Sequence, residues 1–555
     1  MICRKPYASW LFLAGMLLFV RPATAQWAGP VYGPGSHQYL PPRASNGLPV
    51  GTAITALLAQ IAVLQAQMAK ISAAGIPTSF GQPYTNTTGV LAVCHFQASC
   101  RAWANGSVAG YAGAMQKARS MGFDAFSIDL GAYDGNYQQN VDNMYAACNQ
   151  LRLANNGAVN DKGVGDFKLF ITLDMATFTY TQAAILPVLT KYLKDPSNLI
   201  FKGKPLYSTY TGGRFGTQDN LRSFWQGINS GLASAGAAPT FIPGFETTDT
   251  ACNYIPNTPG NCAAMAAYLK TFADGWWQFP SGNTPFDQAS SGLPADEART
   301  QATRAAGLYV MTGMMGQYWG AAHSVARDGT SRFYNEFYGG EGIAAYWKSV
   351  MTAQRPDIVQ FCTWNDYDEG SNIDDQDVGP ASSWPYLTHS AVAGYYKSKS
   401  GLVSEWMWGV QNYKTGIVPK TAYDTIVYQC RPQTAACVLT QTAGVLVDPL
   451  GPIAYVNGEA GGQSTGGTGA GLRDEAYITT RLQSSGYVTF SVGTLSSVRL
   501  APAGESHFRV PIMAGTPSLT LSRQGAVVLT VPGLEAITAA ADYANANYFT
   551  QAAHN

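Results

Sequence analysis

Between residues 89 and 365, short runs of β-branched and aromatic residues alternate with amphipathic, helix-like stretches. The strand-like runs lie at 89–96, 124–131, 168–175, 204–212, 240–246, 275–279, 308–315 and 357–365. Helical stretches separate them, for example at 110–122, 140–154, 220–235, 261–273 and 341–354. This alternation is typical of an α/β fold, and eight units over roughly 300 residues predict a (β/α)8 TIM barrel at 89–400.

The segments on either side of this region have different patterns. Residues 415–535 contain alternating runs such as YVTFSVG and AVVLTV between Gly, Pro and Ser turns, which predicts a C-terminal antiparallel β-sandwich domain. We expect the Ala-rich tail at 536–555 to be a terminal helix or frayed. Residues 26–88 are predicted to be an N-terminal extension with a short N-terminal helix at about 50–74, followed by a linker.

The helix at about 50–74 has apolar residues such as Ile54, Leu57, Ile61 and Leu64 at alternating spacings of three and four. This spacing makes a narrow apolar seam, but the seam lasts under about three heptads, too short to establish a coiled coil. Two interpretations stay open, packing on the chain's own barrel or self-association through residues 50–74. Deleting residues 27–75 and measuring the mass in solution distinguishes them.

The first 25 residues have the features of a signal peptide. Arg4 and Lys5 precede the apolar run LFLAGMLLFV, which ends before Ala23-Thr24-Ala25. We predict cleavage after Ala25 and a secreted or periplasmic protein. The apolar run is about ten residues, too short to span a bilayer, and no later segment reaches that length. No membrane association is therefore expected after cleavage.

The overall charge gives no reason to expect an ionic partner. The chain has 34 basic and 34 acidic residues, so its net charge is zero and nothing favours binding to nucleic acid. Charged residues make up 12% of the chain, roughly half of the ~25% in average proteins. Such a composition suits an exported protein that handles a neutral, hydroxyl-rich ligand.

Nine cysteines become eight once Cys3 is removed with the signal peptide, and an even number in an exported chain is consistent with disulfides. The preferred pairs are Cys252 with Cys262 and Cys430 with Cys437, and Cys100 with Cys148 is a further pairing. Cys94 and Cys362 lie in apolar strand-like runs and are interpreted as buried thiols. No Cys or His spacing indicates zinc.

Polar and aromatic residues follow nearly every predicted strand. Active sites of TIM barrels lie at the carboxyl ends of the strands, so we expect a cleft lined by carboxylates and aromatic rings there. Strand-end aspartates also cap helices, and His95 and the tryptophans are equally explained as core residues. Trp276 and Trp277 are adjacent, so at most one of them faces the cleft. The predicted substrate-binding residues are His95, Asp129, Asp174, Glu246, Trp277, Tyr318, Trp319, Trp364 and Asn365.

The stretch Asp357–Asp377, DIVQFCTWNDYDEGSNIDDQD, changes from an apolar strand to a cluster of carboxylates. Glycoside hydrolysis requires two carboxyl groups, one protonated and one ionised, on either side of the scissile bond. We predict Glu369 as the general acid, since a neighbouring carboxylate and burial against Trp364 would raise its pKa. Asp366 is the predicted second catalytic residue, with Asp129, Asp174 or Glu246 as rivals, and Asp368 is expected to point away.

A calcium loop is the competing interpretation of this cluster. Counted from Asp366, the fifth, sixth and twelfth positions are Gly370, Ser371 and Asp377, where an EF-hand has Asp or Asn, Gly and Glu. The motif fails at all three positions. We therefore predict no metal site and no cofactor, and leave another cation site or a purely structural acidic turn as alternatives.

The run DIVQFCTWNDYDEGSNI resembles the TWNDYGES signature of glycoside hydrolase family 71, the secreted α-1,3-glucanases often called mutanases. The segments VLAVCHF, ARSMGFDAFSIDLG and KLFITLDM are similar to the family's first three strands, in the same order, and the likeness covers most of 89–535. The resemblance implies a (β/α)8 barrel that hydrolyses α-1,3-glucan with inversion and without a cofactor. It places the family's catalytic Asp and Glu on Asp366 and Glu369.

This sequence departs from the family pattern at places where substrate would be read. It has WWQFPSG where the family has SWDAWP, DEGS where the family has GES, and Asp129 where the family has Asn. The expected function is a secreted glycoside hydrolase with a polysaccharide substrate, an α-glucan with α-1,3 linkages. The alternatives are a related glycosidase acting on another α-linked glycan and a non-catalytic glycan-binding protein.

Overall fold

The structure is a computed structural model. It describes residues 90–98, 106–120, 122–154, 167–213, 216–245, 259–277, 279, 293–315, 318–319, 332–335, 338–366, 371, 373–374, 424–430, 445–448, 451–457, 475–533, 536–538 and 549–555. The predicted signal peptide, the helix at about 50–74 and the linker lie outside these residues. Ser79–Asn555 form one compact unit. Within the described ranges, no helix combines the length and the apolar character needed to cross a membrane.

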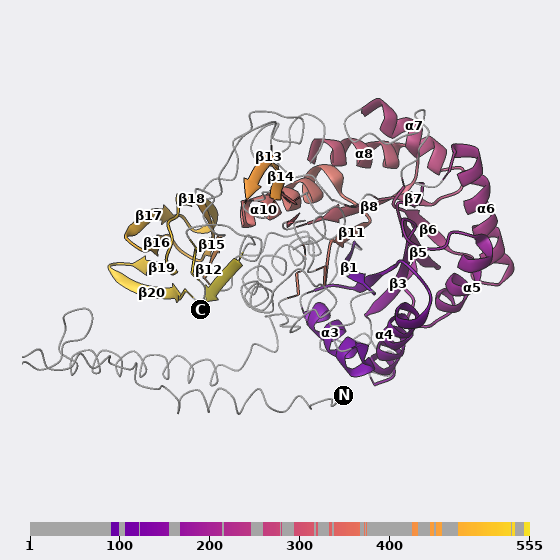
Figure 1. Cartoon of the computed structure of the whole chain (residues 1–555), viewed down its shortest axis with the longest axis horizontal. Helices are drawn as coiled ribbons and strands as arrows, with labels where there is room; N and C mark the ends of the chain where they lie inside the picture. The colour runs from indigo at the N-terminus through magenta and orange to yellow at the C-terminus, as the bar shows by residue number, and fades with distance from the viewer. Residues whose placement is uncertain are drawn as a thin grey trace, which may run out of the picture. The chain divides into compact units, whose positions relative to one another are not determined.

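A strongly curled sheet of parallel strands is the centre of the α/β part (Figure 1). Each of the eight predicted runs contains one of its strands. Along the sheet the order is β6-β5-β3-β2-β1-β11-β8-β7, and the short β4 (Ile200–Phe201) pairs antiparallel with β5. The bounds are β1 Leu91–Gln97, β2 Ala125–Leu130, β3 Lys168–Asp174, β5 Lys204–Tyr210, β6 Thr240–Pro243, β7 Gly275–Trp276, β8 Tyr309–Met314 and β11 Ile358–Phe361.

Backbone contacts also join β6 to β7, the two strands at opposite ends of this order. Gly244 and Trp277 form a parallel bridge. The amide of Asp274 donates to the carbonyl of Phe241 at 2.9 Å, and the amide of Trp277 donates to the carbonyl of Pro243 at 3.0 Å. The two ends of the curled sheet are thus held together by hydrogen bonds.

Helices lie on the outer side of this sheet (Figure 1). Helix α5 illustrates how a capping residue and buried apolar residues define one of these helices. Thr181 caps α5 by accepting a hydrogen bond from the Ala184 amide, and the apolar residues Ile185, Val188 and Leu189 are buried beneath it. The bounds are α3 Val108–Ser120, α4 Gly135–Ala154, α5 Gln182–Leu193, α6 Gln218–Ser234, α7 Pro259–Leu269, α8 Leu293–Ala305 and α10 Gly340–Ser349, which continues into the π-helical turn η2 Val350–Gln354.

Side chains of the parallel strands alternate between the helix layer and the inside of the curl. On β1, Phe96 packs against Tyr111 of α3 with ring centroids 5.9 Å apart. His95 and Gln97, on the other face, therefore point inward. The inward face is partly polar, and its hydroxyl groups are paired, as between Ser127 and Thr172 at 2.6 Å. Strand alternation alone thus directs His95 and Gln97 to the inside.

A small second sheet joins distant parts of the chain, with strand order β13-β14-β10-β9. Its strands are β9 Tyr318–Trp319, β10 Arg332–Asn335, β13 Val445–Asp448 and β14 Gly451–Asn457. β10, which follows β8 in the chain, pairs in parallel with β14. The local pattern of the sequence did not predict this sheet.

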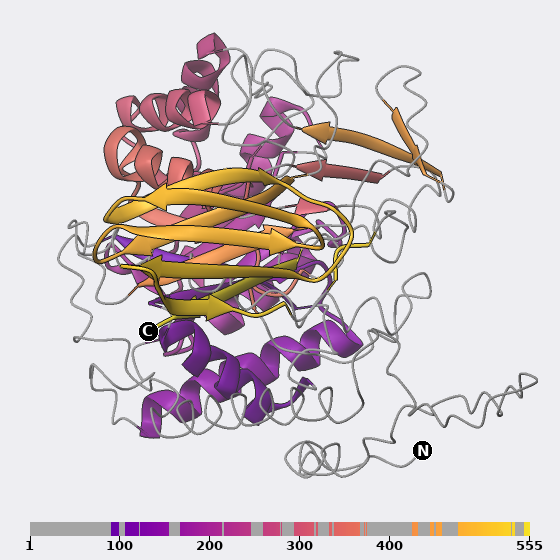
Figure 2. The same ribbon diagram turned by 90° about the vertical axis from the view of Figure 1, so that its left-hand side faces the viewer.

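The C-terminal region contains two four-stranded antiparallel sheets with one shared hydrophobic core (Figure 2). Tyr428 of the first sheet and Phe490 of the second meet in this core, with ring centroids 5.7 Å apart. The first sheet has the order β18-β15-β12-β21 and the second β17-β16-β19-β20. The bounds are β12 Thr425–Cys430, β15 Glu475–Leu482, β16 Gly486–Val492, β17 Leu495–Ala501, β18 Gly504–Pro511, β19 Pro517–Arg523, β20 Ala526–Val531 and β21 Phe549–His554.

The end of the chain differs from the expected terminal helix or frayed tail. Residues Phe549–His554 form β21, which pairs antiparallel with β12 from Cys430↔Phe549 to Thr425↔His554. The expectation was wrong for these residues. It rested on the Ala-rich local sequence, whereas pairing with a strand more than a hundred residues earlier determines the conformation.

Three of the cysteines assigned to disulfides are buried thiols, Cys148, Cys262 and Cys430. The Cys148 thiol donates a hydrogen bond to the Phe167 carbonyl at 3.2 Å, and burial raises its pKa to about 11. The structure therefore contains none of the predicted bridges Cys100–Cys148, Cys252–Cys262 and Cys430–Cys437, and these predictions were wrong. The cysteines proposed as their partners, Cys100, Cys252 and Cys437, lie outside the described residues. Cys94 and Cys362 are buried, as predicted.

Candidate active site

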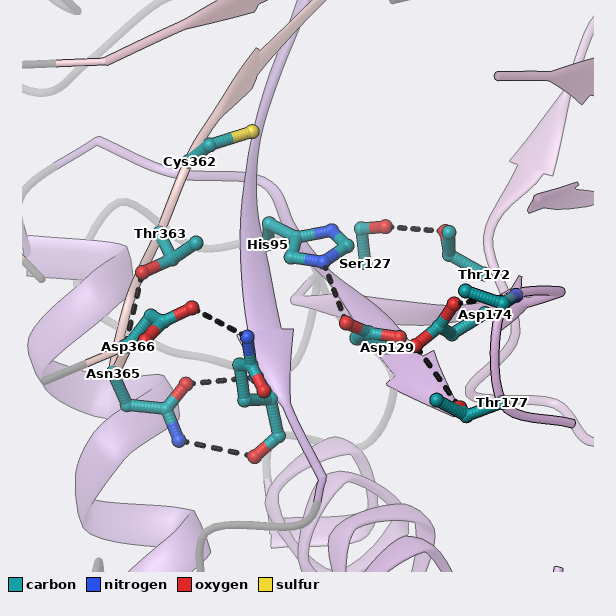
Figure 3. Close-up of polar contacts among 12 residues, drawn as sticks. His95, Ser127, Asp129, Thr172, Asp174, Thr177, Cys362, Thr363, Asn365 and Asp366 are labelled. Atoms are coloured by element: carbon teal, nitrogen blue, oxygen red, sulfur yellow. Dashed lines mark hydrogen bonds and ion pairs between the residues drawn. The ribbon is translucent and has the colours of Figure 1, made fainter. Parts of the chain in front are cut away.

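Four polar side chains lie at the carboxyl edge of the parallel sheet, and Figure 3 labels three of them, Asp129, Asp174 and Asp366. Gln97 is the last residue of β1, Asp174 is the last residue of β3, and Asp129 lies one residue before the end of β2. Asp366 follows β11, the other neighbour of β1. Because neighbouring parallel strands end at the same edge, residues 269 positions apart in the chain, Gln97 and Asp366, come into contact.

Gln97 orients the predicted catalytic residue Asp366. The Gln97 amide Nε2 donates to Asp366 Oδ2 at 2.6 Å, and the Asp366 backbone amide donates to Thr363 Oγ1 at 2.9 Å. Asp366 is 7% exposed. An ionised carboxylate only accepts hydrogen bonds, so an amide donor suits the ionised form of Asp366. Gln97 was not among the predicted site residues.

Asn365 holds the catalytic segment against β1 and does not face a ligand. Its Oδ1 accepts a hydrogen bond from the backbone amide of Gln97 at 2.8 Å, and its Nδ2 donates one to the backbone carbonyl of Gln97 at 3.1 Å. The side chain is buried, with 1% exposed. The predicted substrate-binding role of Asn365 was therefore wrong, because both ends of its amide are used to pair with backbone.

The segment that carries Asp366 is closed on itself at its base. The Ile373 amide donates to the Thr363 carbonyl at 3.0 Å, and the Asp374 amide donates to the Trp364 carbonyl at 3.1 Å. Asp374 is fully buried and pairs with Lys117 of α3, Nζ to Oδ1, at 2.6 Å. Both ends of the loop between Trp364 and Ile373 are thus fixed, while its predicted acid, Glu369, lies outside the described residues.

His95 is a buried histidine that holds Asp129. Its Nε2 lies 3.2 Å from Asp129 Oδ2, and Gln360 Nε2 lies 3.0 Å from its Nδ1. With the Gln360 amide as donor, Nδ1 accepts and the Nε2 proton is directed to Asp129. His95 is 1% exposed, which matches the core alternative for this residue. The other oxygen, Asp129 Oδ1, is buried and receives no hydrogen bond from the described part of the chain.

Asp174 is a carboxyl group that titrates near neutral pH. Burial, followed by the charge of the adjacent Asp129, raises its pKa from 3.8 to about 6. Hydrogen bonds from the Ala176 amide at 2.9 Å and the Thr177 hydroxyl at 3.1 Å act in the opposite direction. Figure 3 shows the Asp129 and Asp174 carboxyl groups next to each other. The edge therefore holds two adjacent carboxyl groups in different surroundings, one of them readily protonated.

The adjacent tryptophans of β7 face opposite sides of the sheet, as predicted. Trp276 lies under the Arg299 guanidinium, 5.8 Å from it, on the helix side. Trp277 points inward, 6.3 Å from the His95 ring, and its Nε1 donates to the Thr209 carbonyl at 3.0 Å. Trp277 is nevertheless fully buried. Trp277 packs beneath the polar residues of the sheet edge, and its ring is not accessible to a ligand. The predicted substrate-binding role of Trp277 was therefore wrong.

Trp364 is also misassigned by the sequence pattern. It is fully buried and packs on Phe126 and Phe123, with centroids 5.2 Å and 6.4 Å away, in the layer between strands and helices. Its predicted substrate-binding role was wrong, because the side chain points outward from the curl. The partly exposed rings at the edge are Tyr210 and Phe279, 5.2 Å apart. Tyr210 ends β5, so the strand-end rule that found Asp174 applies to it equally.

Three further predicted residues are not tested by these contacts. Glu246 lies outside the described residues. Tyr318 and Trp319 form β9, and the structure describes their backbone only. Within the described part of the chain, no group of three or more His, Cys, Asp or Glu side chains is arranged to hold a metal ion.

Residues 89–555 match the profile of a known family, described as Glycosyl hydrolase family 71. The chain belongs to this family. Family 71 relatives include the glucan endo-1,3-alpha-glucosidase agn1 of Schizosaccharomyces pombe, 24% identical over 79% of this chain and 88% of the relative. Another is the mutanase Pc12g07500 of Penicillium rubens, 22% identical over 76% of this chain and 79% of the relative.

Among solved structures, the GH99 endo-alpha-mannosidase from Bacteroides thetaiotaomicron is similar with a TM-score of 0.37 and 14% identity, over 56% of this chain and 80% of that one. Membership of family 71 makes the protein a glycoside hydrolase. Glycoside hydrolysis uses a pair of carboxyl groups, and the sheet edge of this protein carries such groups.

Proposed function

We propose that this family 71 enzyme is a secreted α-1,3-glucanase that cleaves its polymer by acid/base hydrolysis with inversion at the anomeric carbon. The names of the two curated relatives support the substrate, and the family supports the reaction class. The observation that carries the proposal is the contact between Gln97 and Asp366, which fixes a carboxylate at the same edge of the sheet as Asp129 and Asp174.

In this mechanism Asp366 is the base and Glu369 is the acid. Asp366, ionised and oriented by Gln97 and Thr363, takes a proton from the attacking water. Glu369 gives a proton to the leaving glycosidic oxygen. Inversion requires the two carboxyl groups to stand about 6.5–9.5 Å apart, so that water fits on the far side of the sugar ring.

Asp129 and Asp174 are proposed to bind sugar hydroxyls at the same edge. The buried Oδ1 of Asp129 is an acceptor for a hydroxyl proton. Asp174, when protonated, also donates a hydrogen bond, so the pair presents one acceptor and one donor. His95 acts through Asp129 as a positioning residue, because its Nε2 holds the second oxygen. The partly exposed rings of Tyr210 and Phe279 supply apolar surface for a sugar face.

The architecture proposed for this function is a closed (β/α)8 barrel with a β-sandwich accessory domain. The hydrogen bonds between β6 and β7 support closure of the curled sheet. The core shared by two antiparallel sheets supports the sandwich. Export rests on the signal-peptide pattern before Ala25, and N-terminal sequencing of the secreted protein tests it.

The decisive experiment is a substrate screen of the purified protein. α-1,3-, α-1,4- and α-1,6-glucans and α-mannan are incubated with the enzyme, and the anomers of the products are followed by NMR. We expect turnover of α-1,3-glucan with initial release of the β-anomer. Glu369→Gln is expected to lose turnover and keep polysaccharide binding. If no polymer is turned over while binding is retained, the protein would be a glycan-binding protein and not an enzyme.

A further inference from the structure

The two C-terminal sheets differ in what lies on their outer faces. On the first sheet, Arg509 of β18 forms a bidentate pair with Glu341 of α10, with both N–O distances 3.1 Å. Its guanidinium also stacks 3.6 Å from the Tyr338 ring, and Tyr338 contacts Tyr477 of β15 with centroids 5.5 Å apart. The outer face of this sheet is therefore occupied by residues around α10. Among the described residues, no such ion pair or ring contact lies on the outer face of the second sheet.

The second sheet exposes a row of side chains in which three of four are apolar or aromatic. Strand pairing places Leu500, Tyr487, Ser522 and Val527 side by side across β17, β16, β19 and β20. Three of the four are unusually exposed, Leu500 at 59%, Tyr487 at 55% and Val527 at 60%. Their strand neighbours, such as Val488 and Leu521, point the other way into the core. In Figure 2 the strands of this sheet lie toward the viewer.

The next row on the same face is rich in hydroxyl groups. It consists of Val498, Thr489, Thr520 and Thr530 in register. A third row, across β17, β16 and β19, has serine in each strand. The face thus combines one aromatic ring and several branched aliphatic side chains with many hydroxyls, all on a regular pleated surface.

No charge interrupts this face. The four strands, all of whose residues are described, contain two charged residues, Arg499 and Arg523. Arg499 is paired with the inward-facing Val488, so it belongs to the opposite side. Arg523 forms an ion pair with Asp424, the residue before β12 of the first sheet. Its Nη2 donates to Asp424 Oδ1 at 2.8 Å. The face therefore offers neither sign of charge to a partner.

We propose that this face is a second carbohydrate-binding surface, which holds the enzyme on insoluble α-glucan apart from the catalytic edge. Its neutrality matches an uncharged polymer and gives nothing to nucleic acid or an anionic membrane. A sugar ring presents apolar C–H faces to Tyr487 and Leu500, and its hydroxyl groups to the threonine row. An exposed apolar row of this kind marks an interaction site. The identity of the polymer rests on the proposed function.

The test is adsorption of the full-length protein to insoluble α-1,3-glucan, measured by depletion from the supernatant in the cold. Tyr487→Ser and Leu500→Ser are compared with Leu153→Ser, a control on α4 whose side chain is 62% exposed. We expect each of the first two to weaken the partition constant about tenfold, the equivalent of about 1.4 kcal/mol, and the control to leave it unchanged. Hydrolysis of soluble α-1,3-gluco-oligosaccharides is expected to be the same in all variants.

Unchanged adsorption in both variants, with normal hydrolysis of soluble oligosaccharides, would overturn this proposal and leave the proposed function intact. The same holds if sedimentation shows a wild-type dimer that Tyr487→Ser dissociates while adsorption is unchanged, because the face would then join two copies. Loss of adsorption in a protein that hydrolyses no α-glucan would support the binding surface and count against the proposed function.

Discussion

Replacing Asp174 by Asn tests the electrostatics of the carboxyl pair directly. Asp174→Asn keeps the shape of the side chain and an acceptor for the Ala176 amide, but it removes the charge that faces Asp129. The wild-type pKa is raised from 3.8 to about 6. Two pKa units correspond to about 3 kcal/mol that the folded state loses when this group ionises. Asp174 keeps some contact with solvent, so we expect about 2 kcal/mol.

The raised pKa of Asp174 sets how its contribution to folding stability changes with pH. A folded pKa above the unfolded one means that the folded state binds the proton more tightly. Wild-type stability from this group is fully present below about pH 3.8 and is lost as pH rises through about 6. The amide of the variant does not titrate. The difference in unfolding free energy, variant minus wild type, should therefore grow by about 2 kcal/mol between pH 4 and pH 7.5.

The assay is urea unfolding of both proteins at pH 4, 5, 6 and 7.5, followed by tryptophan fluorescence. Asp219→Asn is the control, because the Asp219 carboxylate is 89% exposed and its loss should give a difference independent of pH. Asp129→Asn should lower the pKa of Asp174 by removing the neighbouring charge. A stability difference for Asp174→Asn that stays constant from pH 4 to 7.5 would refute the reasoning.

Three other contacts give predictions of their own. Gln97→Leu removes a hydrogen bond to the Asp366 carboxylate, worth about 1.5–3 kcal/mol, so kcat of the folded enzyme should fall about 10- to 150-fold. An unaltered kcat would show that Asp366 does not need this donor. Lys117→Met removes the ammonium group 2.6 Å from the buried Asp374 carboxylate and should cost about 3 kcal/mol in urea unfolding, whereas Lys117→Arg should restore most of it. Arg509→Ala, which removes a partly exposed ion pair and a ring contact, should cost only about 1 kcal/mol by the same method; a loss as large as that of Lys117→Met would contradict this ranking.

The strand ends were predictable because parallel α/β sequences alternate in a regular way. Each of the eight apolar runs contains a strand, and the polar residues at the ends of two of them, Asp129 and Asp174, lie at the same edge. Gln97 was also within reach of the pattern. It lies two residues after His95 on the same strand, and period-two alternation puts both on one face.

The burial of the aromatic residues was not predictable in this way. Trp364 and Asn365 follow a strand just as Asp366 does, yet the chain turns so that Trp364 packs on Phe126 and Asn365 grips the backbone of β1. These contacts depend on residues more than two hundred positions away. The same reason explains β21, whose conformation depends on β12 and not on its own Ala-rich sequence.

The pairing of β1 with β11 has a consequence for how the chain is made. Leu91 pairs with Ile358, so β1 cannot pair with β11 until the intervening chain has been synthesised. At 5–20 residues per second this takes about 15 to 50 s. Until then one edge of the nascent sheet is open to other chains. Chains that stop short of residue 358 should therefore aggregate, and full-length biosynthesis should depend on a factor that shields that edge.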